Sequence, residues 1–539
     1  MDTLSKPTIA AFHSFVPRLV RITLFVLFAL IFQFSNTVYL NLTGTLTGAS
    51  QMLKEDLTFF FQMTMAGLCL VFPMLFRFKL RFTSRQIITT SALIVAGMMA
   101  IAMYSDSIIL LATASFILGA AKMVGTFETL VSIQLIITPK KDYGVFFSVA
   151  LGLVLLSGQV SGIWAVQLNY DYDWRAIYRI LLAAHAVMIL LAQLVLHDVR
   201  VAKKLPLYGI DWLGALLWSL LFTCITYIFS YGQIMDWFWA KQIRVAVFLS
   251  LLFAVITLFW MFRAGRPYIH PEVFKIKSVN TAIFMILLMQ PFLSASVSVM
   301  GPFTMGVLQL DDLNNAALNW YIALGILTGS LFSYGWFRWY NGPFKLFFVI
   351  AFSSLSLHYI LLYFSIGSLA DSSVIALPYF LRGFGNILLF TGTGKYITRD
   401  AGPAIFTQVL CYLAMARNAV GSLIVASLLG YGQYTSTMDF HTKLAGNTGT
   451  YSPEVAAFYS AAYNKAILGG SNTTDSAILA AKGLYGKVNQ QAVLLAGREI
   501  FGTMAIVGLS IILLLLFWHF SADITRKIPS WKDIRSVTR

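Results

Sequence analysis

Residues 108–137 read IILLATASFILGAAKMVGTFETLVSIQLII, and this run decides what kind of fold the chain can have. An α-helix rises about 1.5 Å per residue and the hydrocarbon core of a bilayer is about 30 Å thick, so about 20 apolar residues cross it. The run is longer than that and contains only two charged side chains, Lys122 and Glu128. It therefore predicts a transmembrane helix that carries two ionisable groups inside the membrane.

Apolar runs of similar length recur along almost the whole chain. Of its 539 residues, 58% are hydrophobic and only 11% are charged, whereas soluble domains carry about 25% charged residues. The ten-residue segments of alternating polarity that are typical of membrane barrels are not seen. We therefore predict an all-α integral membrane protein with fourteen spans, at residues 20–42, 57–76, 86–104, 108–137, 144–168, 176–197, 211–231, 242–263, 280–308, 316–338, 344–366, 372–394, 403–430 and 498–520.

The charges between these runs predict an orientation, because cytoplasmic connections of membrane proteins are enriched in lysine and arginine. Every second connection is basic, whereas those between them carry aspartates such as Asp106 and Asp236. Both termini are therefore expected in the cytoplasm. The same bias accounts for most of the formal net charge of +16, so no nucleic-acid partner is needed to explain it. The basic connections and the tail include Arg77, Lys79, Arg81, Arg85, Lys140, Lys141, Arg200, Lys203, Lys204, Arg263, Arg266, Lys275, Lys277, Arg338, Lys345, Lys395, Arg399 and residues 526–539.

One connection, residues 431–497, is much longer than the others and is expected on the outer side. Two of its stretches, SPEVAAFYSAAYNKAIL and SAILAAKGLYGKVNQQAVLLAG, have helical character, and Ser452 is a candidate N-cap for the first. We expect a small extracytoplasmic helical element that caps the bundle, and docking of a partner is the alternative.

Several stretches follow one another in the order seen in a known family. They are DWRAIYRI at 173–180, YGIDWLGALLWSLLFTCITYIFSYGQIMDWF at 208–238, RPYIHPEVFKIKSVNTAIF at 266–284, LRGFGNILLF at 381–390, ARNAVGSLIVASLLG at 416–430 and VNQQAVLLAGREIF at 488–501. Together they resemble the major facilitator superfamily (MFS), and specifically its fourteen-span drug:proton antiporters of the QacA/EmrB type. The resemblance implies an N-terminal six-helix half at 1–205, two inserted helices at 206–265 and a C-terminal six-helix half at 266–539. It also implies alternating access around a site near the bilayer midplane.

The chain departs from that family where the family keeps its charged residues. FSNTV at 34–38 offers Ser35 where the family's first span has an acidic residue, and Ser115 stands in place of an arginine in the fourth span. The loop at 74–85 lacks the family's aspartate and glycines, and GQVSG at 158–162 keeps the glycines of the antiporter motif but not its proline. The chain therefore resembles a divergent member of this family. The residues that couple transport to protons in the family cannot be assigned to equivalent positions here.

Lys122 and Glu128 are the candidate proton-coupling residues, because an ionisable group at mid-bilayer normally faces a cavity or a partner. They are six residues apart, which places them about 240° apart around a helix, so they are not expected to pair with each other. Lys122 lies on nearly the same stripe as Ser115 and is a candidate for a relocated family arginine. Glu128 is the candidate proton carrier, and the alternative is that it only anchors a helix interface or pairs with a cation from another span.

Substrate contacts are expected from Phe32, Gln33, Asn36 and Tyr39 in the first span and from Gln290, Tyr321 and Asn386 in the second half. Arg382 and Arg417 fall in stretches that resemble the family, where such arginines are architectural, so we expect a structural role for both.

The sequence as a whole favours a proton-coupled secondary transporter that exports amphipathic, drug-like small molecules from the bacterial cell across the inner membrane. Uptake by symport is one alternative, and a membrane-embedded lipid-modifying enzyme is another, although the seven histidines are scattered. No metal, cofactor or catalytic residue is predicted, and no glycine-rich phosphate loop indicates ATP-driven transport. Whether a periplasmic adaptor and an outer-membrane channel take part stays open.

Overall fold

The computed structural model describes residues 12–13, 15–137, 142–198, 207–340, 342–367, 371–398, 405–446 and 452–517. Within these ranges the chain is helical, and the β-structure amounts to one isolated bridge between Phe12 and Leu196. Several basic residues used above to predict the orientation lie outside the described residues: Lys140, Lys141, Arg200, Lys203, Lys204, Arg399 and residues 526–539. The orientation of the termini therefore stays a prediction.

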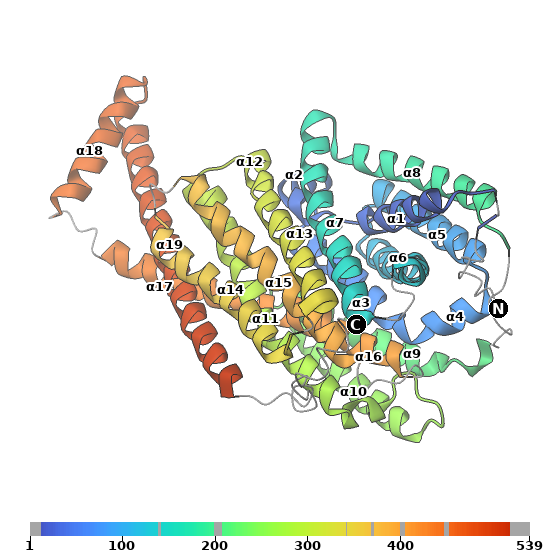
Figure 1. Ribbon diagram of the computed structural model, residues 1–539. Coiled ribbons are helices and arrows are strands. Elements are labelled where there is room, and N and C mark those ends of the chain that lie inside the picture. Colours follow the sequence, from blue (N-terminus) through green and yellow to red (C-terminus); the bar gives the residue numbers. More distant parts are fainter. Residues whose placement is uncertain are drawn as a thin grey trace, which may run out of the picture.

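The helices follow one another in an order close to the predicted spans (Figure 1). The α-helices are α1 (Arg18–Phe34), α2 (Thr43–Ser50), α3 (Lys54–Leu70), α4 (Leu75–Arg81), α5 (Ser84–Tyr104), α6 (Ile108–Ile137), α7 (Tyr143–Asp171), α8 (Trp174–Val195), α9 (Trp212–Tyr231), α10 (Lys241–Arg263), α11 (Lys277–Gly301), α12 (Asp312–Ala317), α13 (Asn319–Gly335), α14 (Phe344–Ser365), α15 (Ala376–Ile397), α16 (Phe406–Ala414), α17 (Ala426–Gly446), α18 (Pro453–Leu468) and α19 (Thr473–Phe517). Short 3₁₀ segments are η1 (Leu40–Leu42), η2 (Phe72–Met74), η3 (Leu207–Gly209), η4 (Trp237–Trp239), η5 (Pro271–Lys275) and η8 (Ser372–Ile375), and π-helical segments are η6 (Pro302–Val307), η7 (Trp336–Tyr340) and η9 (Met415–Val425).

Thirteen helices among the described residues are long and apolar enough to cross a membrane, and Leu19–Phe34 is a shorter apolar helix in the place of the first predicted span. Helices are the expected element here, since every backbone polar group in lipid must be satisfied within the protein. The prediction of a continuous first span at 20–42 is wrong, because α1 ends at Phe34 and the chain is not helical again until Leu40. The polar run Ser35, Asn36, Thr37 marks this break.

The first six spans pack around α6, which contacts α1, α3 and α5, while α5 contacts α8. The last six repeat the arrangement: α15 contacts α11, α13 and α14, and α14 contacts α19. Figure 1 shows α1, α5, α6 and α8 of the first group on the right and α13, α14 and α15 of the second group to their left. The packing is therefore that of two similar bundles.

Reciprocal glycines set the register of this repeat. A side chain on Gly67 of α3 would lie 2.0 Å from the carbonyl oxygen of Phe116, and one on Gly119 of α6 would lie 2.0 Å from that of Thr64. In the second bundle, Gly325 of α13 and Gly383 of α15 make the same reciprocal approach, at 2.1 and 2.2 Å, to the carbonyls of Phe380 and Ile322. Glycine allows such close backbone contact between membrane helices.

The two bundles meet through α7, which contacts α13 and α15, and through α3, which contacts α16 and η9. An ion pair joins them, since Lys395 of α15 donates to Asp142 at the start of α7 at 3.1 Å. Gly152 of α7 lies against Ser330 of α13. Within GQVSG, Gly158 has no atom close to it, whereas a side chain on Gly162 would lie 2.8 Å from the side chain of Asn41.

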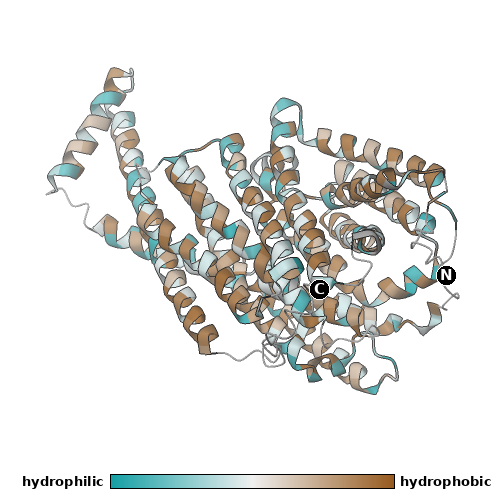
Figure 2. Ribbon diagram, viewed as in Figure 1, coloured by the Kyte–Doolittle hydropathy of each residue, from teal (hydrophilic) through white to brown (hydrophobic). Residues whose placement is uncertain are grey.

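The predicted inserted helices are α9 and α10, which contact each other, and α9 also packs on α3 and η9. The long connection is helical as predicted, because α17 extends to Gly446, α18 follows, and α19 runs without a break into the last span. Ser452 is the N-cap residue of α18, although its side chain makes no cap hydrogen bond. In Figure 2, α18 and the adjoining part of α19 carry many hydrophilic residues, whereas the other end of α19 is hydrophobic.

Candidate functional site

The break in the first span buries polar side chains inside the first bundle, among them Ser35 and Thr37. Helix α1 ends with carbonyl oxygens that have no helical partner, and such groups require other donors when they are buried. Lys122 of α6 supplies them: its Nζ donates to the carbonyl of Gln33 at 2.9 Å, to that of Ser35 at 3.0 Å and to Oδ1 of Asn36 at 3.1 Å. A cation at the C-terminus of a helix is also favoured by the helix dipole.

Lys122 is only 4% exposed, and among the described residues it forms no ion pair with a carboxylate. Its three oxygen partners are neutral. A buried ammonium held only by neutral oxygens keeps its positive charge uncompensated in a region of low dielectric constant, which is costly. Among the described residues, the charge of Lys122 is therefore offset by these three oxygens and by the C-terminal end of the α1 dipole.

Hydroxyl and amide side chains from neighbouring spans surround the same break. Thr37 Oγ1 is hydrogen-bonded to Ser115 Oγ at 2.7 Å, and Gln33 Nε2 donates to Thr126 Oγ1 at 3.0 Å. Tyr178 of α8 donates its hydroxyl to the carbonyl of Thr37. Ser115 and Lys122 thus contact the same segment, which confirms that they share one stripe of the fourth span.

Glu128 is buried at 1% exposure and has a different set of partners. Its Oε1 accepts from Lys79 of α4 and from Ser84 at the start of α5, while its Oε2 has no hydrogen-bond partner in the described part of the chain. The prediction that Glu128 and Lys122 lie on different faces of α6 is confirmed. Glu128 has instead the cation from another segment that the sequence left as the alternative.

Four positions of α6 that contact other segments recur at every third residue: Gly119, Lys122, Gly125 and Glu128. Gly119 meets α3, Lys122 meets the end of α1, and a side chain on Gly125 would lie 2.3 Å from the ring of Phe32. Because three residues turn a helix by 300°, the pattern moves slowly around it. One helix therefore contacts α3, α1 and the α4–α5 connection in succession.

The remaining predicted residues of the first span are part of this packing. Phe32 is fully buried and approaches the ring of His185, and Tyr39 is buried and donates its hydroxyl to the carbonyl of Phe34 at 2.6 Å. Gln33 and Asn36 are half-buried and hydrogen-bonded as described above. The structure brings all four together around the break.

In the second bundle, helix α11 is continuous but contains Pro291 in its interior. Proline removes a backbone donor and bends a helix. Carbonyls just beyond it receive donors from other spans: Tyr359 donates to Phe292, and Arg382 Nη2 donates to Leu293 at 3.4 Å. Arg382 of α15 therefore contacts α11 much as Lys122 of α6 contacts α1.

Two predicted polar residues of the second bundle have unsatisfied atoms. Nε2 of Gln290 in α11 and Oδ1 of Asn386 in α15 are buried and have no hydrogen-bond partner within the described ranges. Helices α11 and α15 contact each other. Asn386 follows Gly383 by three residues, as Lys122 follows Gly119, so the two residues occupy equivalent positions in the two bundles.

The other two predicted residues lie apart from this pair. The guanidinium of Arg417 in η9 lies 3.9 Å from the centre of the Phe390 ring, a cation–π contact between two spans. Tyr321 of α13 is 38% exposed.

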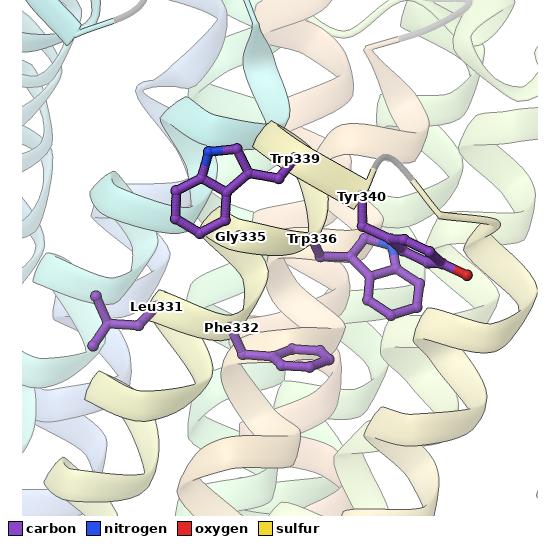
Figure 3. A pocket seen from close by; sticks show the side chains of 6 residues that line it. All are labelled: Leu331, Phe332, Gly335, Trp336, Trp339 and Tyr340. Carbon is purple, nitrogen blue, oxygen red and sulfur yellow. The ribbon is translucent and has the colours of Figure 1, made fainter. Parts of the chain in front are cut away.

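Two of the hollows formed by the described residues lie elsewhere, and none of the seven predicted substrate residues lines either of them. One, of about 500 Å³, is formed by α13 and η7, with Trp336, Trp339 and Tyr340 among its residues (Figure 3). The other, of about 840 Å³, lies where α3, the α9–α10 turn and α17 meet. No group of three or more His, Cys, Asp and Glu side chains that could hold a metal is found among the described residues.

Sequence reasoning missed the partners of the two charged groups. Lys79 was assigned only to the orientation of the chain, and Tyr178 and Thr126 were not singled out. A buried carboxylate near the end of a span does indicate that a cation is needed. The basic cluster at 77–85 is an available signal for Lys79, whereas nothing in the sequence indicates Tyr178.

No protein-family profile and no curated protein sequence matches the chain. Its structure is nevertheless similar to solved transporters. An auto-inhibited POT family peptide transporter matches with a TM-score of 0.52 and 14% identity over 96% of this chain and 98% of that one. The nucleoside transporter NupG, as a mutant, matches with a TM-score of 0.52 and 11% identity over 92% and 98%. The human organic anion transporter MFSD10 matches with a TM-score of 0.50 and 15% identity over 77% and 94%. The chain therefore has the fold of the major facilitator superfamily of membrane transporters.

Proposed function

We propose that the chain is a proton-coupled secondary transporter that exports amphipathic, drug-like small molecules from the bacterial cell by alternating access. It would be a divergent relative of the fourteen-span QacA/EmrB antiporters, with both termini in the cytoplasm. The two bundles would be residues 1–205 and 266–539, with 206–265 inserted between them. The transporter fold and the repeated packing of the spans support this proposal.

The single observation that carries the coupling proposal is the environment of Lys122. Its ammonium is buried, has only neutral oxygen partners and holds the end of the broken first span. Loss of a proton from Lys122 removes its positive charge and one of its three N–H donors. Its hydrogen bonding to the end of α1 therefore weakens. Arrival of a cationic substrate nearby would favour that loss by repulsion. Proton release and movement of the first span would thus be coupled.

Glu128 offers a second protonation site that responds to conformation. While α4 lies against α6, Lys79 compensates the carboxylate. If α4 moves away during the transport cycle, the buried carboxylate is left without a cation, and protonation becomes the less costly state. This gives Glu128 the proton-carrying role predicted from the sequence, with Lys79 as the group that controls it.

The proposed substrate site lies between the broken first span and its counterpart in the second bundle. Phe32, Gln33, Asn36 and Tyr39 surround the break, and Gln290 and Asn386 bring amide atoms that lack partners in the described structure. Since Asn386 is equivalent to Lys122, the two residues would face the substrate from opposite bundles. Tyr321 is proposed at the edge of this site, and Arg382 and Arg417 are proposed to support the helices around it.

The test uses inside-out membrane vesicles that contain the full chain, with ethidium as the amphipathic probe and an acidic interior. We expect ethidium accumulation that collapses when the pH gradient is dissipated. Lys122→Arg keeps the charge but cannot release a proton near neutral pH. It should therefore abolish gradient-driven accumulation while preserving exchange of ethidium without a gradient. Lys465→Met, which removes an exposed lysine of α18, is the matched control.

Accumulation that ignores the pH gradient would refute proton coupling. Full gradient-driven activity in Lys122→Arg would refute the coupling role of Lys122 and leave it a structural one. Ethidium movement in the same direction as the protons would replace export by uptake symport.

A further inference from the structure

The hollow of about 840 Å³ at one end of the inserted helices has the properties of a ligand site that is separate from the proposed transport site. Its wall comes from three parts of the chain: the start of α3, the turn between α9 and α10, and α17. Its volume is in the range of small-molecule pockets, about 300–1,000 Å³. A turn that only connected α9 and α10 would not need such a hollow beside it.

The backbone of that turn is strained. Asp236 and Trp237 both adopt left-handed conformations, with φ of 51° and 52°. Aspartate tolerates this region, but a bulky residue such as tryptophan rarely adopts it. Strain of this kind persists only where the surroundings enforce it, and it is concentrated at functional positions.

Packing holds the Trp237 ring in a fixed place. The ring lies 6.1 Å from that of Phe229 and 6.0 Å from that of Tyr431, measured between centroids. Its carbon atoms also occupy the space of a side chain at Gly232, where an added Cβ would lie 2.6 Å away. The indole nitrogen is buried and has no hydrogen-bond partner among the described residues. The ring is thus preorganised rather than free at the surface.

The charge of the hollow favours a cation. Glu55 and Asp236 line it, and neither forms an ion pair in the described part of the chain, whereas Lys54 is the only basic residue in its wall. Trp237, Trp239, Tyr431 and Tyr434 add aromatic faces. Carboxylates combined with aromatic rings are the chemistry that recognises quaternary ammonium groups and similar cations. An interfacial aromatic belt explains exposed tryptophans such as Trp239, but it does not explain a left-handed, clamped Trp237.

We propose that this hollow binds a lipophilic organic cation of the quaternary ammonium or phosphonium class, outside the transport site. The proposal rests on the proposed function, because a cation site beside the inserted helices would serve to capture or release the transported substrate. Binding itself can be measured without transport, so the two proposals can fail separately.

The experiment measures binding of tetraphenylphosphonium to the purified full chain by calorimetry in nanodiscs. Asp236→Asn removes the charge while keeping a residue that tolerates the left-handed backbone, and it should weaken binding at least about fivefold. Trp237→Ala should do the same or more. Asp106→Asn and Trp212→Ala are matched controls, because both residues are exposed and lie outside the hollow, and they should leave affinity unchanged.

Tetraphenylborate, which has a similar shape and the opposite charge, should bind more weakly than the phosphonium. Equal binding of both ions, or unchanged phosphonium affinity in Asp236→Asn and Trp237→Ala, would overturn the proposal. Equal phosphonium affinity in phosphatidylglycerol and phosphatidylcholine nanodiscs would assign the site to a soluble cation. Loss of phosphonium binding in phosphatidylcholine nanodiscs would mean that the choline headgroup of the lipid occupies the hollow. It would overturn the assignment to a soluble cation. If the phosphonium binds as predicted but ethidium is not transported, only the proposed function fails.

Discussion

At the scale of single residues, the two ionisable groups of the fourth span have opposite kinds of environment. Lys122 is a cation among neutral oxygens, and Glu128 is a carboxylate beside the cation of Lys79. Helical geometry alone predicted that they would not pair. It could not predict their partners, because these come from α1 and α4, whose positions depend on how the spans pack.

The Lys79–Glu128 pair should respond asymmetrically to substitution. Lys79 reaches solvent, with 16% of its side chain exposed, whereas that of Glu128 is 1% exposed. Lys79→Met leaves a buried, uncompensated carboxylate and should destabilise the protein by about 3 kcal/mol. Glu128→Gln leaves only a partly hydrated lysine and should cost less. Thermal unfolding in detergent measures both.

A double variant separates the two effects. Lys79→Met/Glu128→Gln should be close in stability to Glu128→Gln, because no buried carboxylate is then left uncompensated. Equal losses for the two single variants would show that the pair has no electrostatic role.

At the scale of helices, reciprocal glycines control how closely the spans of each bundle approach. Gly119→Ala and Gly383→Ala would place a methyl group about 2 Å from the backbone oxygens of Thr64 and Ile322. Each substitution should lower stability by about 1–3 kcal/mol through overpacking. Gly97→Ala is the matched control, because nothing lies near that position of α5; it should be neutral or slightly stabilising, since alanine favours a helix. Equal thermal midpoints for all three variants would contradict this account.

The sequence predicted most of the spans because apolar length is a local property. It failed at the first span, where Ser35, Asn36 and Thr37 end α1 inside the predicted run. Their polarity is visible in the sequence, but a break in lipid is tolerable only when donors such as Lys122 and Tyr178 replace the lost hydrogen bonds. Those donors come from other spans, so the break depends on tertiary structure. The same holds for the hydrogen bonds of Gln33 and Asn36, two of the predicted substrate residues, which depend on the packing of α1 on α6.

At the scale of the whole molecule, two bundles with the same internal packing meet along α7 and α13 and along α3 and η9. Asp142 at the start of α7 and Lys395 of α15 form an ion pair that also joins the bundles, with both side chains about one-third exposed, so the pair is worth little on its own. Breaking this ion pair alone would therefore cost little stability. In the proposed transporter, alternating access would consist of separating and rejoining α7 and α13 while each bundle stays intact.

A disulfide across that contact tests the proposed movement most directly. After replacement of Cys69, Cys224 and Cys411, cysteines at Gly152 and Ser330 would link the two bundles, since a Cβ at Gly152 lies 3.0 Å from that of Ser330. Cysteines at Gly508 and Ser356 are the control within one bundle, with a corresponding distance of 2.9 Å. We predict that oxidation of the first pair stops gradient-driven ethidium accumulation, that reduction restores it, and that the control pair has no effect. Full accumulation by completely cross-linked Gly152→Cys/Ser330→Cys protein would contradict alternating access between these bundles.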